Sequence, residues 1–559
     1  MKRVYCILVL VLILLLNSCL PENITGTTAS ETTIPTKSEE STGPIDPDGP
    51  DDPELLQSRV SYTIPPAVSL YNKCALYLED SQLPLYSVYV NNSQYWKGNV
   101  TDRDTVGVGY FFLEGKVNVS LRCEGMTSCV VRPLSAKVEA SVENSVATFT
   151  LSSSGNYSIE PNGDPTKAIF LFVSDYADKD IKETQNKVIR FEKGLHTDEN
   201  NPYIVNNTVT LSSNTTVILE DGAVVRARFV ANNANNITIC GTGIIDGSAF
   251  IRNATTGQVT VPLDFNYCTD LTFKDFSVLD PAGWCVNWYF CTDSKIENIK
   301  IISSRSNGDG ISLQSCQRID VSGCFVRSWD DSLVVKNYPQ WSNRDIEGTT
   351  RDITFRNCTV WTDLAQSMEI GYETVGQVME NITFENITVL HNFHKPIISI
   401  HNGNNADIKN VTYNRITVED ASMGRGDAGS NNQLIEISVA YSSTWSDSHK
   451  KTPLGSIDTV TISNVTVLSG NIALPIKIAG CRDLRSGYGA SIHYVSNVLL
   501  NNIWANGKQI GGGYAYLTVN EYANATFNLG PAPIYAQFIF SQSDETLAQY
   551  TNFAQVEYN

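Results

Sequence analysis

Four segments of the sequence repeat one eight-residue pattern: ITFRNCTV at 353–360, ITFENITV at 382–389, VTYNRITV at 411–418 and VTISNVTV at 460–467. In each segment the first, sixth and eighth residues are apolar or Cys, and an Asn stands near the middle. Asn tolerates the left-handed backbone conformation that a sharp bend requires. The pattern therefore predicts two short strands joined by a bend, because a helical repeat would space its apolar residues three and four apart.

Weaker copies of this pattern extend the repeat in both directions. The segments begin at Leu271, Ile296, Ile319, Ile353, Ile382, Val411, Val460 and Val498. Their separations vary from 23 to 49 residues while the strands stay short. Constant strands with variable loops are typical of a solenoid whose coils stack their inward residues on one another. The sequence therefore predicts an all-β protein whose main part, residues 176–510, is a right-handed parallel β-helix.

Several cysteines belong to this repeat. Cys268, Cys291 and Cys316 each stand shortly before a segment, and Cys324 and Cys358 share the sixth position. Small buried thiols suit such ladders. We therefore expect these five to be free and stacked, with disulfides there as the less favoured alternative.

The N-terminus has the features of an export signal. Lys2 and Arg3 precede an apolar run over residues 4–16, which is too short for a stable membrane span. The run ends in LNSC at 16–19, which resembles a bacterial lipobox, whose Cys is acylated after cleavage. We expect residues 1–19 to be a lipoprotein signal peptide with lipidation at Cys19; an ordinary signal peptide that ends near a Cys is the alternative.

Residues 20–58 are rich in Thr, Ser, Pro and acidic residues, which predicts a disordered tether. The implied location is that of an exported, membrane-anchored lipoprotein at a bacterial cell surface or in the periplasm. The next segment, residues 59–175, has short alternating runs separated by turn residues and predicts an antiparallel β-sandwich. Cys123 and Cys129 could pair within it, and residues 511–559 are expected to form a C-terminal β tail.

Charge and composition exclude some partners and cofactors. The formal net charge of −19 disfavours nucleic acid, for which a basic patch is expected. No Cys and His residues have the spacing of a metal site, so no site of that kind is expected. We expect a monomer whose partners are a polysaccharide and, through the lipid anchor, a membrane.

Acidic residues cluster on two neighbouring coils. Asp309 lies 13 residues after Ile296, and Asp330 and Asp331 lie 11 and 12 residues after Ile319. Because adjacent coils are about 4.8 Å apart, these carboxylates should gather on one face. Trp284 and Gln366 stand 13 residues into the flanking coils and would extend the patch into a groove along the axis.

Such a cluster can perform acid–base chemistry on a sugar polymer. Like charges at close range raise the pKa of at least one carboxyl group. Glycosidic cleavage needs a carboxylic acid to protonate the leaving oxygen and a carboxylate to activate water. Solvated loop acids and a Ca²⁺ site are the alternatives for the same residues.

The motifs around these acids resemble those of glycoside hydrolase family 28, the polygalacturonases. The matching stretches are PAGW at 281–284, NGDG at 307–310 and WDDS at 329–332, followed by Lys336, with GTGIIDG at 241–247 upstream. The resemblance covers roughly residues 185–400. It implies the pectin-lyase-like β-helix and inverting hydrolysis without a metal or organic cofactor.

The resemblance also implies roles for individual residues. Asp330 would be the general acid, and Asp309 and Asp331 would activate the water. The remaining positions of the implied site are expected to bind substrate: Asn307, Trp284, Lys336, Gln366, Glu369 and His401.

Two positions depart from the pattern of the family. The Gly-His-Gly motif is replaced by Ala-Gln-Ser at 365–367, so Gln366 stands in place of a His. An Arg-x-Lys pair that grips the galacturonate carboxylate is replaced within Ile-Ser-Ile-His at 398–401. Family 49, the dextranases and isopullulanases, is similar in placing a β-sandwich before the β-helix and keeping three Asp without the His. The resemblance therefore implies hydrolase chemistry without implying pectin as the substrate.

Two other classes of function fit the same fold. A polysaccharide lyase would use the acids to bind Ca²⁺ and would need a base such as Lys336 or Lys395. A non-catalytic, surface-displayed polysaccharide-binding protein would show a groove lined by aromatic residues with the acids dispersed.

Overall fold

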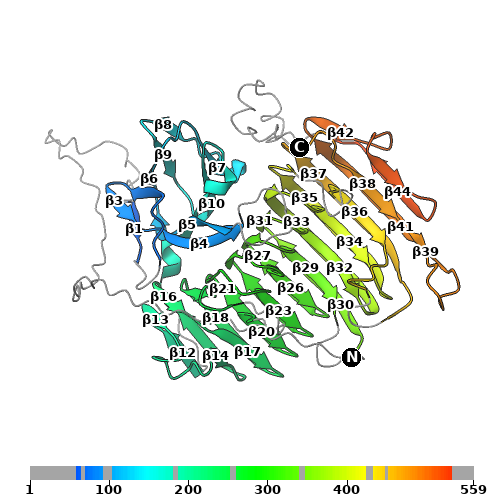
Figure 1. The fold of residues 1–559 in the computed structure, drawn as a ribbon, viewed down its shortest axis with the longest axis horizontal. Coiled ribbons are helices and arrows are strands. Elements are labelled where there is room, and N and C mark those ends of the chain that lie inside the picture. Colours follow the sequence, from blue (N-terminus) through cyan, green and yellow to red (C-terminus); the bar gives the residue numbers. More distant parts are fainter. Residues whose placement is uncertain are drawn as a thin grey trace, which may run out of the picture.

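The computed structural model describes residues 58–63, 69–91, 103–179, 187–251, 260–338, 346–422, 432–446 and 451–531. From residue 187 onward these residues wind into stacked coils whose strands pair in parallel with the next coil (Figure 1). Each coil gives one strand to an 11-stranded sheet, and two strands, or one long bent strand, to a 20-stranded sheet. The prediction of an all-β, right-handed parallel β-helix is confirmed.

The 11-stranded sheet carries one side of each coil. Its strands are β14 (Thr208–Thr210), β17 (Arg228–Asn232), β20 (Leu263–Asn266), β23 (Val286–Tyr289), β26 (Ile311–Gln314), β29 (Leu333–Asn337), β32 (Met368–Thr374), β34 (Ile398–Asn402), β36 (Ile435–Val439), β38 (Ile476–Ala479) and β43 (Leu517–Val519).

The 20-stranded sheet forms the remaining sides. Its strands are β12 (Lys187–Phe191), β13 (Gly194–His196), β15 (Thr215–Leu219), β16 (Ala223–Val225), β18 (Asn235–Cys240), β19 (Ile244–Asp246), β21 (Thr269–Lys274), β22 (Ser277–Leu279), β24 (Thr292–Glu297), β25 (Lys300–Ile302), β27 (Gln317–Ser322), β28 (Phe325–Ser328), β30 (Gly348–Arg356), β31 (Thr359–Thr362), β33 (Gly376–Asn392), β35 (Asp407–Val418), β37 (Ser456–Val467), β41 (Val495–Ala505), β42 (Lys508–Ile510) and β44 (Ala523–Asn528). A small hairpin joins β39 (Cys481–Arg482) to β40 (Ile492–His493). Beyond residue 510, β43 and β44 continue the two large sheets by pairing with β38 and β41.

The bends between strands follow the predicted pattern. Asn357, Asn386 and Asn464 are all left-handed, with φ between 54° and 55°, at the fifth position of their segments. In the third segment Arg415 takes this conformation, and its Asn lies one residue earlier. The Asn386 side chain donates to that of Asn357 at 2.7 Å, so the bend residues also form a ladder between coils.

One predicted register is wrong. Ile353 pairs in line with Ile319 and Ile382, but the residue in line with Leu271 and Ile319 is Ser294, two residues before Ile296. The Ser294 hydroxyl donates to the Thr292 carbonyl at 2.6 Å, so it can occupy a buried inward position without an unsatisfied donor. A polar residue therefore interrupts the apolar pattern, and the next apolar residue looked like the start of the segment.

The cysteines of the repeat are free and buried, as predicted. In the preceding domain the possible Cys123–Cys129 pair is not formed. Cys123 is disulfide-bonded to Cys74, which joins β6 (Val117–Cys123) to β2 (Cys74–Leu78), and Cys129 is free. The partner lies 49 residues away in sequence but directly opposite in the antiparallel register, which spacing alone does not show.

The described residues before 180 form two packed sheets. One contains β1 (Arg59–Ser61), β4 (Tyr86–Asn91), β5 (Arg103–Glu114), β7 (Cys129–Arg132), β10 (Gly155–Pro161) and β11 (Ile169–Asp175); the other contains β2 (Cys74–Leu78), β3 (Ser81–Leu83), β6 (Val117–Cys123), β8 (Ser141–Glu143) and β9 (Val146–Leu151). Three short 3-10 turns are η1 (Leu134–Ala136), η2 (Pro165–Lys167) and η3 (Tyr176–Lys179). The sandwich is antiparallel except that β11 pairs with β5 in parallel.

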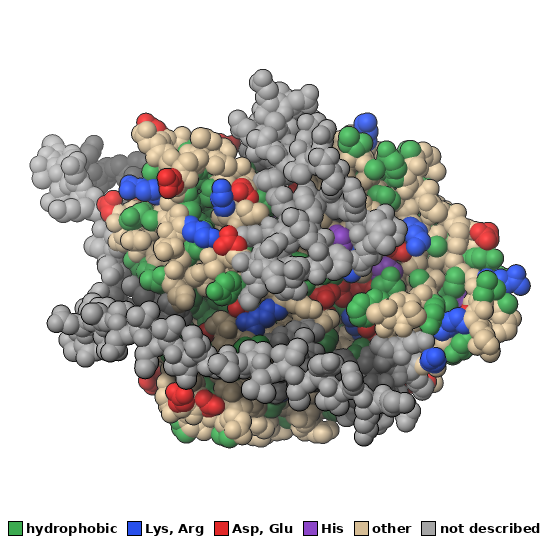
Figure 2. Space-filling model, in the orientation of Figure 1, with side chains coloured by type: hydrophobic (Ala, Val, Ile, Leu, Met, Phe, Trp, Pro, Cys, Tyr) green, Lys and Arg blue, Asp and Glu red, His purple; other side chains and the backbone are tan. Residues whose placement is uncertain are grey.

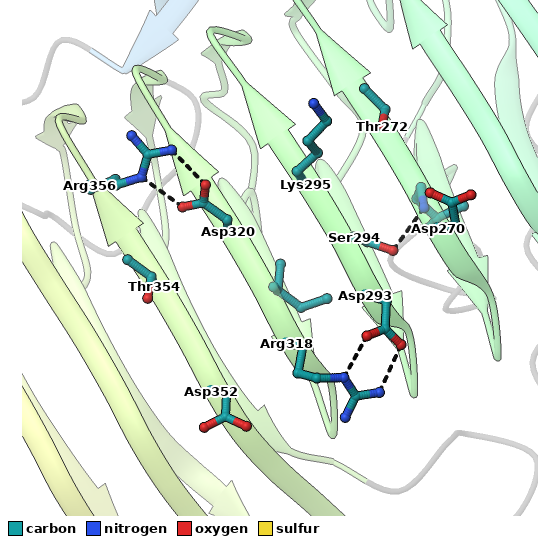
Figure 3. Close-up of a pocket in the computed structure, with 12 residues that line it drawn as sticks. Asp270, Thr272, Asp293, Ser294, Lys295, Arg318, Asp320, Asp352, Thr354 and Arg356 are labelled. Carbon is teal, nitrogen blue, oxygen red and sulfur yellow. Dashed lines mark hydrogen bonds and ion pairs between the residues drawn. The ribbon is translucent and has the colours of Figure 1, made fainter.

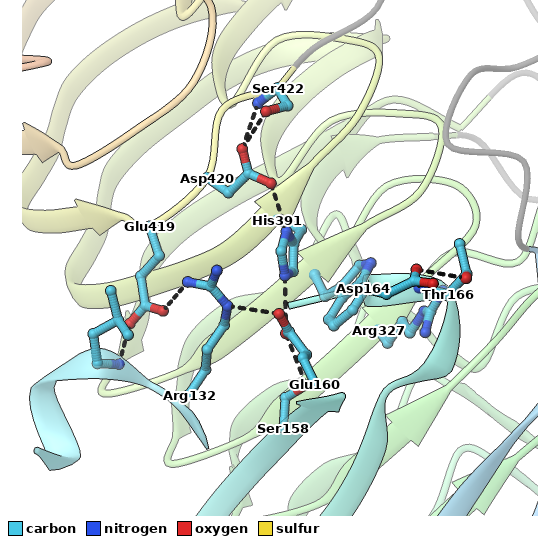
Figure 4. Close-up of polar contacts among 12 residues, drawn as sticks. Arg132, Ser158, Glu160, Asp164, Thr166, Arg327, His391, Glu419, Asp420 and Ser422 are labelled. Carbon is cyan, nitrogen blue, oxygen red and sulfur yellow. Dashed lines mark hydrogen bonds and ion pairs between the residues drawn. The ribbon is translucent and has the colours of Figure 1, made fainter. Parts of the chain in front are cut away.

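The sandwich packs on the outer face of the β-helix through an apolar cluster. Phe170 and Phe172 of β11 contact Phe325 and Trp361 with ring centroids 5.2–5.6 Å apart. Beside this cluster, Arg132 bonds to Glu160 of its own domain at 3.0 Å and to Glu419 of the β-helix at 2.9 Å (Figure 4).

A histidine completes this buried network. His391 of β33 contacts Glu160 at 3.0 Å and Asp420 at 2.8 Å, and all three side chains are almost fully buried. Burial opposes the charge of His391, but Glu160 and Asp420 outweigh it and raise its pKa. Removing one member of such a network leaves uncompensated buried charge.

The outer face of the 20-stranded sheet carries a different set of ions. Asp293 pairs with Arg318, and Asp320 pairs with Arg356, across neighbouring coils (Figure 3). These side chains are 41–49% exposed, so the pairs add little stability. Within the described ranges no helix is long and apolar enough to cross a membrane.

Candidate active site

The predicted acidic residues lie on turns that lead into the 11-stranded sheet. Asp309 precedes β26, and Asp330 and Asp331 precede β29. Ile311 pairs with Leu333, and the Gly310 N–H donates to the Asp331 carbonyl at 2.8 Å, so Asp309 and Asp331 stand side by side on neighbouring coils. The structure therefore brings the three carboxyl groups together.

Two glycines allow close packing at this point, Gly308 within its own turn and Gly310 against the next coil. A Cβ on Gly308 would collide with the Ser303 hydroxyl, and one on Gly310 would collide with the Val326 side chain and the Ser332 carbonyl. Asn307, at the start of the same NGDG motif, has a left-handed backbone with φ 52°. The motif is thus required by packing as well as by its carboxylate.

A buried arginine fixes the turn before Asp309. Arg305 donates to Asp280 at 3.1 Å and to the carbonyl of Gly247 at 3.3 Å. Gly247 is the last residue of the GTGIIDG motif. This motif lies two coils away from the turn that carries Asp309 and helps to hold that turn through Arg305. Sequence reasoning did not identify Arg305, because nothing in the sequence pairs it with these partners.

Trp284 and Gln366 flank the acids as their spacing predicted. The residue after Trp284, Cys285, donates its N–H to the Asp309 carbonyl at 3.0 Å. The Gln366 N–H donates to Asp331 Oδ1 at 3.3 Å. Trp284, Asp309, Asp331 and Gln366 therefore form one row across four successive coils.

The three acids differ in their surroundings. Asp309 is 2% exposed and its Oδ1 has no hydrogen-bond partner among the described residues, whereas Asp330 is partly exposed. Burial, followed by the nearby charge of Asp330, raises the pKa of Asp309 well above its usual range. Burial also raises the pKa of Asp331 to about 7, although Lys336 opposes this.

Lys336 lies among carboxylates. Its Nζ is 3.6 Å from Asp331 Oδ2 and 3.2 Å from Glu373 Oε2, and its side chain is 15% exposed. Burial acts to lower its pKa, but Glu373, Asp331 and the other acids outweigh burial and raise it. Lys336 therefore stays protonated and compensates part of the negative charge of the site.

A second ionic group lies further along the same sheet. His401 Nδ1 contacts Glu369 at 2.8 Å, and His401 Nε2 is 3.4 Å from Glu436. Glu436 in turn contacts Lys477 Nζ at 2.8 Å. Glu369 and His401 were identified from the sequence, but Glu373, Glu436 and Lys477 were missed. The alternating apolar pattern of β36, Ile-Glu-Ile, matches that of β32 and would have pointed to Glu436.

No group of three or more His, Cys, Asp or Glu side chains in the described part of the chain has the arrangement of a metal site. The geometry thus defines a parallel β-helix protein with clustered carboxyl groups on the turns beside one sheet.

Comparison with known proteins assigns the family. The sequence pattern described as Glycosyl hydrolases family 28 matches residues 193–497, which is more than half of the chain. The protein therefore belongs to glycosyl hydrolases family 28, a class of glycosidases, and the resemblance inferred from the motifs is confirmed.

Individual relatives are distant. A "Probable polygalacturonase" of Vitis vinifera is 24% identical over 133 residues, which cover 23% of this chain and 26% of that protein. This chain thus spans about a quarter of the length of that relative.

Among solved structures, Dex49A from Penicillium minioluteum superposes with a TM-score of 0.57 at 14% identity, over 83% of this chain and 96% of that one. An exopolygalacturonase from Thermotoga maritima gives a TM-score of 0.41 at 14% identity, over 61% and 84%. The match to Dex49A shows that the two proteins share a fold.

Proposed function

We propose that this protein hydrolyses a polysaccharide with inversion at the anomeric carbon. The observation that carries the proposal is the placement of the three acids on two adjacent coils: Asp309 and Asp331 are buried side by side, and Asp330 is partly exposed. An exposed carboxyl group can reach a glycosidic oxygen, and two buried ones can hold a water molecule between them.

In this proposal the carboxyl groups act as one unit. Because the pKa of Asp309 and that of Asp331 are raised, the cluster retains a proton in weakly acidic solution, and in the reactive form this shared proton lies on Asp330 while Asp309 and Asp331 are ionised. Asp330 delivers a proton to the glycosidic oxygen as the C–O bond breaks. A water held by Asp309 and Asp331 attacks the opposite face of the sugar and gives up one proton to them. Exchange with solvent returns the proton to Asp330.

The environment of Lys336 favours hydrolysis over elimination. A lyase needs a neutral amine or an equivalent base in the groove. Lys336 stays protonated because carboxylates on both sides raise its pKa. The lyase alternative therefore loses one of its two candidate bases.

The stereochemistry of the product tests this proposal. We expect new reducing ends whose anomeric configuration, followed by proton NMR from the first minutes of reaction, is inverted. Neutral α-glucans and pectic polymers should be screened together with an absorbance assay for unsaturated sugars. Retained configuration would contradict the mechanism, an unsaturated product would replace it by elimination, and binding without new reducing ends would favour the non-catalytic alternative.

We also propose that the protein is exported and anchored through a lipid on Cys19, with residues 20–58 as a tether that holds a monomeric enzyme away from a bacterial membrane. The motif and the composition of these residues, which apart from Ser58 lie outside the described part of the chain, support this. The sandwich would serve as a structural cap or spacer, because the interface with Arg132 and His391 attaches it to the β-helix.

A further inference from the structure

Four residues on the outward side of the 11-stranded sheet form a charge-paired cluster: Glu369, His401, Glu436 and Lys477. The parallel register places four residues in line on successive coils: Glu369, Ser399, Glu436 and Lys477. His401 lies two residues after Ser399 on β34, so it is on the same face of the sheet. His401 lies between the two carboxylates, and Lys477 contacts the second of them.

The cluster adjoins the acids. Glu369 stands one coil beyond Asp331, and His401 stands two coils beyond it. At about 4.8 Å per coil, His401 is about 10 Å from the acids along the axis. In Figure 2, Asp, Glu and His side chains gather on the face crossed by the middle strands of this sheet.

Each of these cations is already neutralised. His401 is held by Glu369 and Glu436, Lys477 by Glu436, and Lys336 by Asp331 and Glu373. The neighbouring carboxylates raise the pKa of His401 to about 10, and His401 and Lys477 lower that of Glu436 to about 2. His401 and Glu436 therefore both remain ionised at neutral pH.

The carboxyl groups beside this sheet outnumber the cations that are paired with them. Asp309, Asp330, Asp331, Glu369, Glu373 and Glu436 lie near Lys336, His401 and Lys477. A sugar carboxylate would have to displace an internal partner of one of these cations. A neutral sugar hydroxyl, in contrast, can donate to a carboxylate oxygen without displacing a cation from it.

We propose that the charge-paired cluster is the subsite for a sugar next to the cleaved bond, and that it selects a neutral sugar over a uronate by keeping His401, Lys477 and Lys336 occupied. This inference rests on the proposed hydrolase function. Glu436 is the residue that sets the preference, because it occupies both His401 and Lys477.

The test removes the Glu436 carboxylate and measures whether an anionic sugar then binds more tightly. In Glu436→Gln, His401 and Lys477 lose a shared partner and become available to an anion. We expect oligogalacturonate to bind this variant about 10- to 100-fold more tightly than it binds the wild type, as judged by isothermal titration calorimetry, because a charge-assisted hydrogen bond is gained. Glu369→Gln, which releases His401 from the other side, is the second variant if Glu436→Gln folds poorly.

Glu380→Gln is the matched control. Glu380 also lies between two cations, 3.1 Å from Arg351 and 3.0 Å from Lys409, but on the other large sheet. The Glu380→Gln variant should bind oligogalacturonate no more tightly than the wild type does. A gain in the control as large as that in Glu436→Gln would show a general effect of net charge and overturn the inference.

Cleavage provides the second readout. The wild type should act on a neutral polymer, among dextran, pullulan and carboxyl-reduced polygalacturonate, at least about 10-fold more efficiently than on polygalacturonate itself. Equal or better cleavage of polygalacturonate would overturn the subsite while leaving the hydrolase proposal in place. If no polymer is cleaved, the hydrolase proposal fails, and the binding comparison alone decides the subsite: no gain in Glu436→Gln refutes it.

Discussion

Replacing Asp331 by Asn is expected to stabilise the protein at neutral pH even though it removes a carboxylate of the proposed site. Asp331 is 6% exposed and lies beside Asp309 and Asp330. Its ionisation in the folded state is unfavourable because burial and like charges outweigh the attraction of Lys336. Asn keeps the shape and can still accept the N–H of Gln366 through its amide oxygen.

The magnitude follows from the shift of the pKa. Burial raises the pKa of Asp331 from 3.8 to about 7. At about 1.36 kcal/mol per unit, ionised Asp331 costs up to about 4 kcal/mol of folding free energy. Between these two values the folded protein keeps a proton that the unfolded chain has released, so the free energy of unfolding falls as the pH rises and levels off above about 7. The variant lacks this decline.

Chemical denaturation at a series of pH values from 4 to 8 measures the effect. The stability of Asp331→Asn relative to the wild type should rise across this range, by up to about 4 kcal/mol. Asp293→Asn is the control. Arg318 lowers the pKa of Asp293 to about 2, so the contribution of this carboxylate changes only below about pH 3.8, and the stability of the variant relative to the wild type should be flat from pH 4 to 8. A relative stability of Asp331→Asn that is flat or falls with pH would refute the argument.

Three further predictions concern the acid, the interface and the anchor. Asp330→Asn should slow cleavage of the natural polymer by roughly 10²–10⁴-fold and that of substrates with good leaving groups much less, because these need little protonation; equal losses on both in steady-state kinetics would contradict the assignment. Arg132→Met should lower the free energy of unfolding by about 3–5 kcal/mol, since it leaves Glu160 and Glu419 buried without their cation, and an unchanged denaturation midpoint would argue against this network. Cys19→Ala should move the folded protein from the membrane to the soluble fraction on cell fractionation, whereas unchanged membrane retention would exclude the lipid anchor.

Much of the fold was predictable because a β-helix is built from local repeats. The apolar positions of segments such as 382–389 and 411–418 specify strands, bend and inward face within eight residues. When the coils stack, each inward residue contacts the equivalent residue of the next coil, so the same contact recurs along the axis of the β-helix. The register error at Ile296 arose because the inward position of that coil is occupied by a polar residue, Ser294. Its hydroxyl donates a hydrogen bond to a backbone carbonyl, and the sequence does not reveal this contact.

The clustering of the acids was also predictable. Asp309 and Asp331 lie on corresponding turns of consecutive coils, so the repeat itself places them together. The shifted register did not disturb this prediction, because the longer turn before Asp309 still ends at the start of the same sheet.

The sequence alone determined the class of fold, the turns that carry the acids, and through its motifs the family. Only the tertiary structure decided which charges neutralise one another. Glu436 reaches His401 and Lys477, and Arg132 reaches Glu419 across 287 residues of sequence, because coils and domains pack in space. The physical reason is that strand patterns depend on the alternation of neighbouring residues, whereas ion pairing depends on distances of 3–4 Å between side chains whose separation along the chain follows no period.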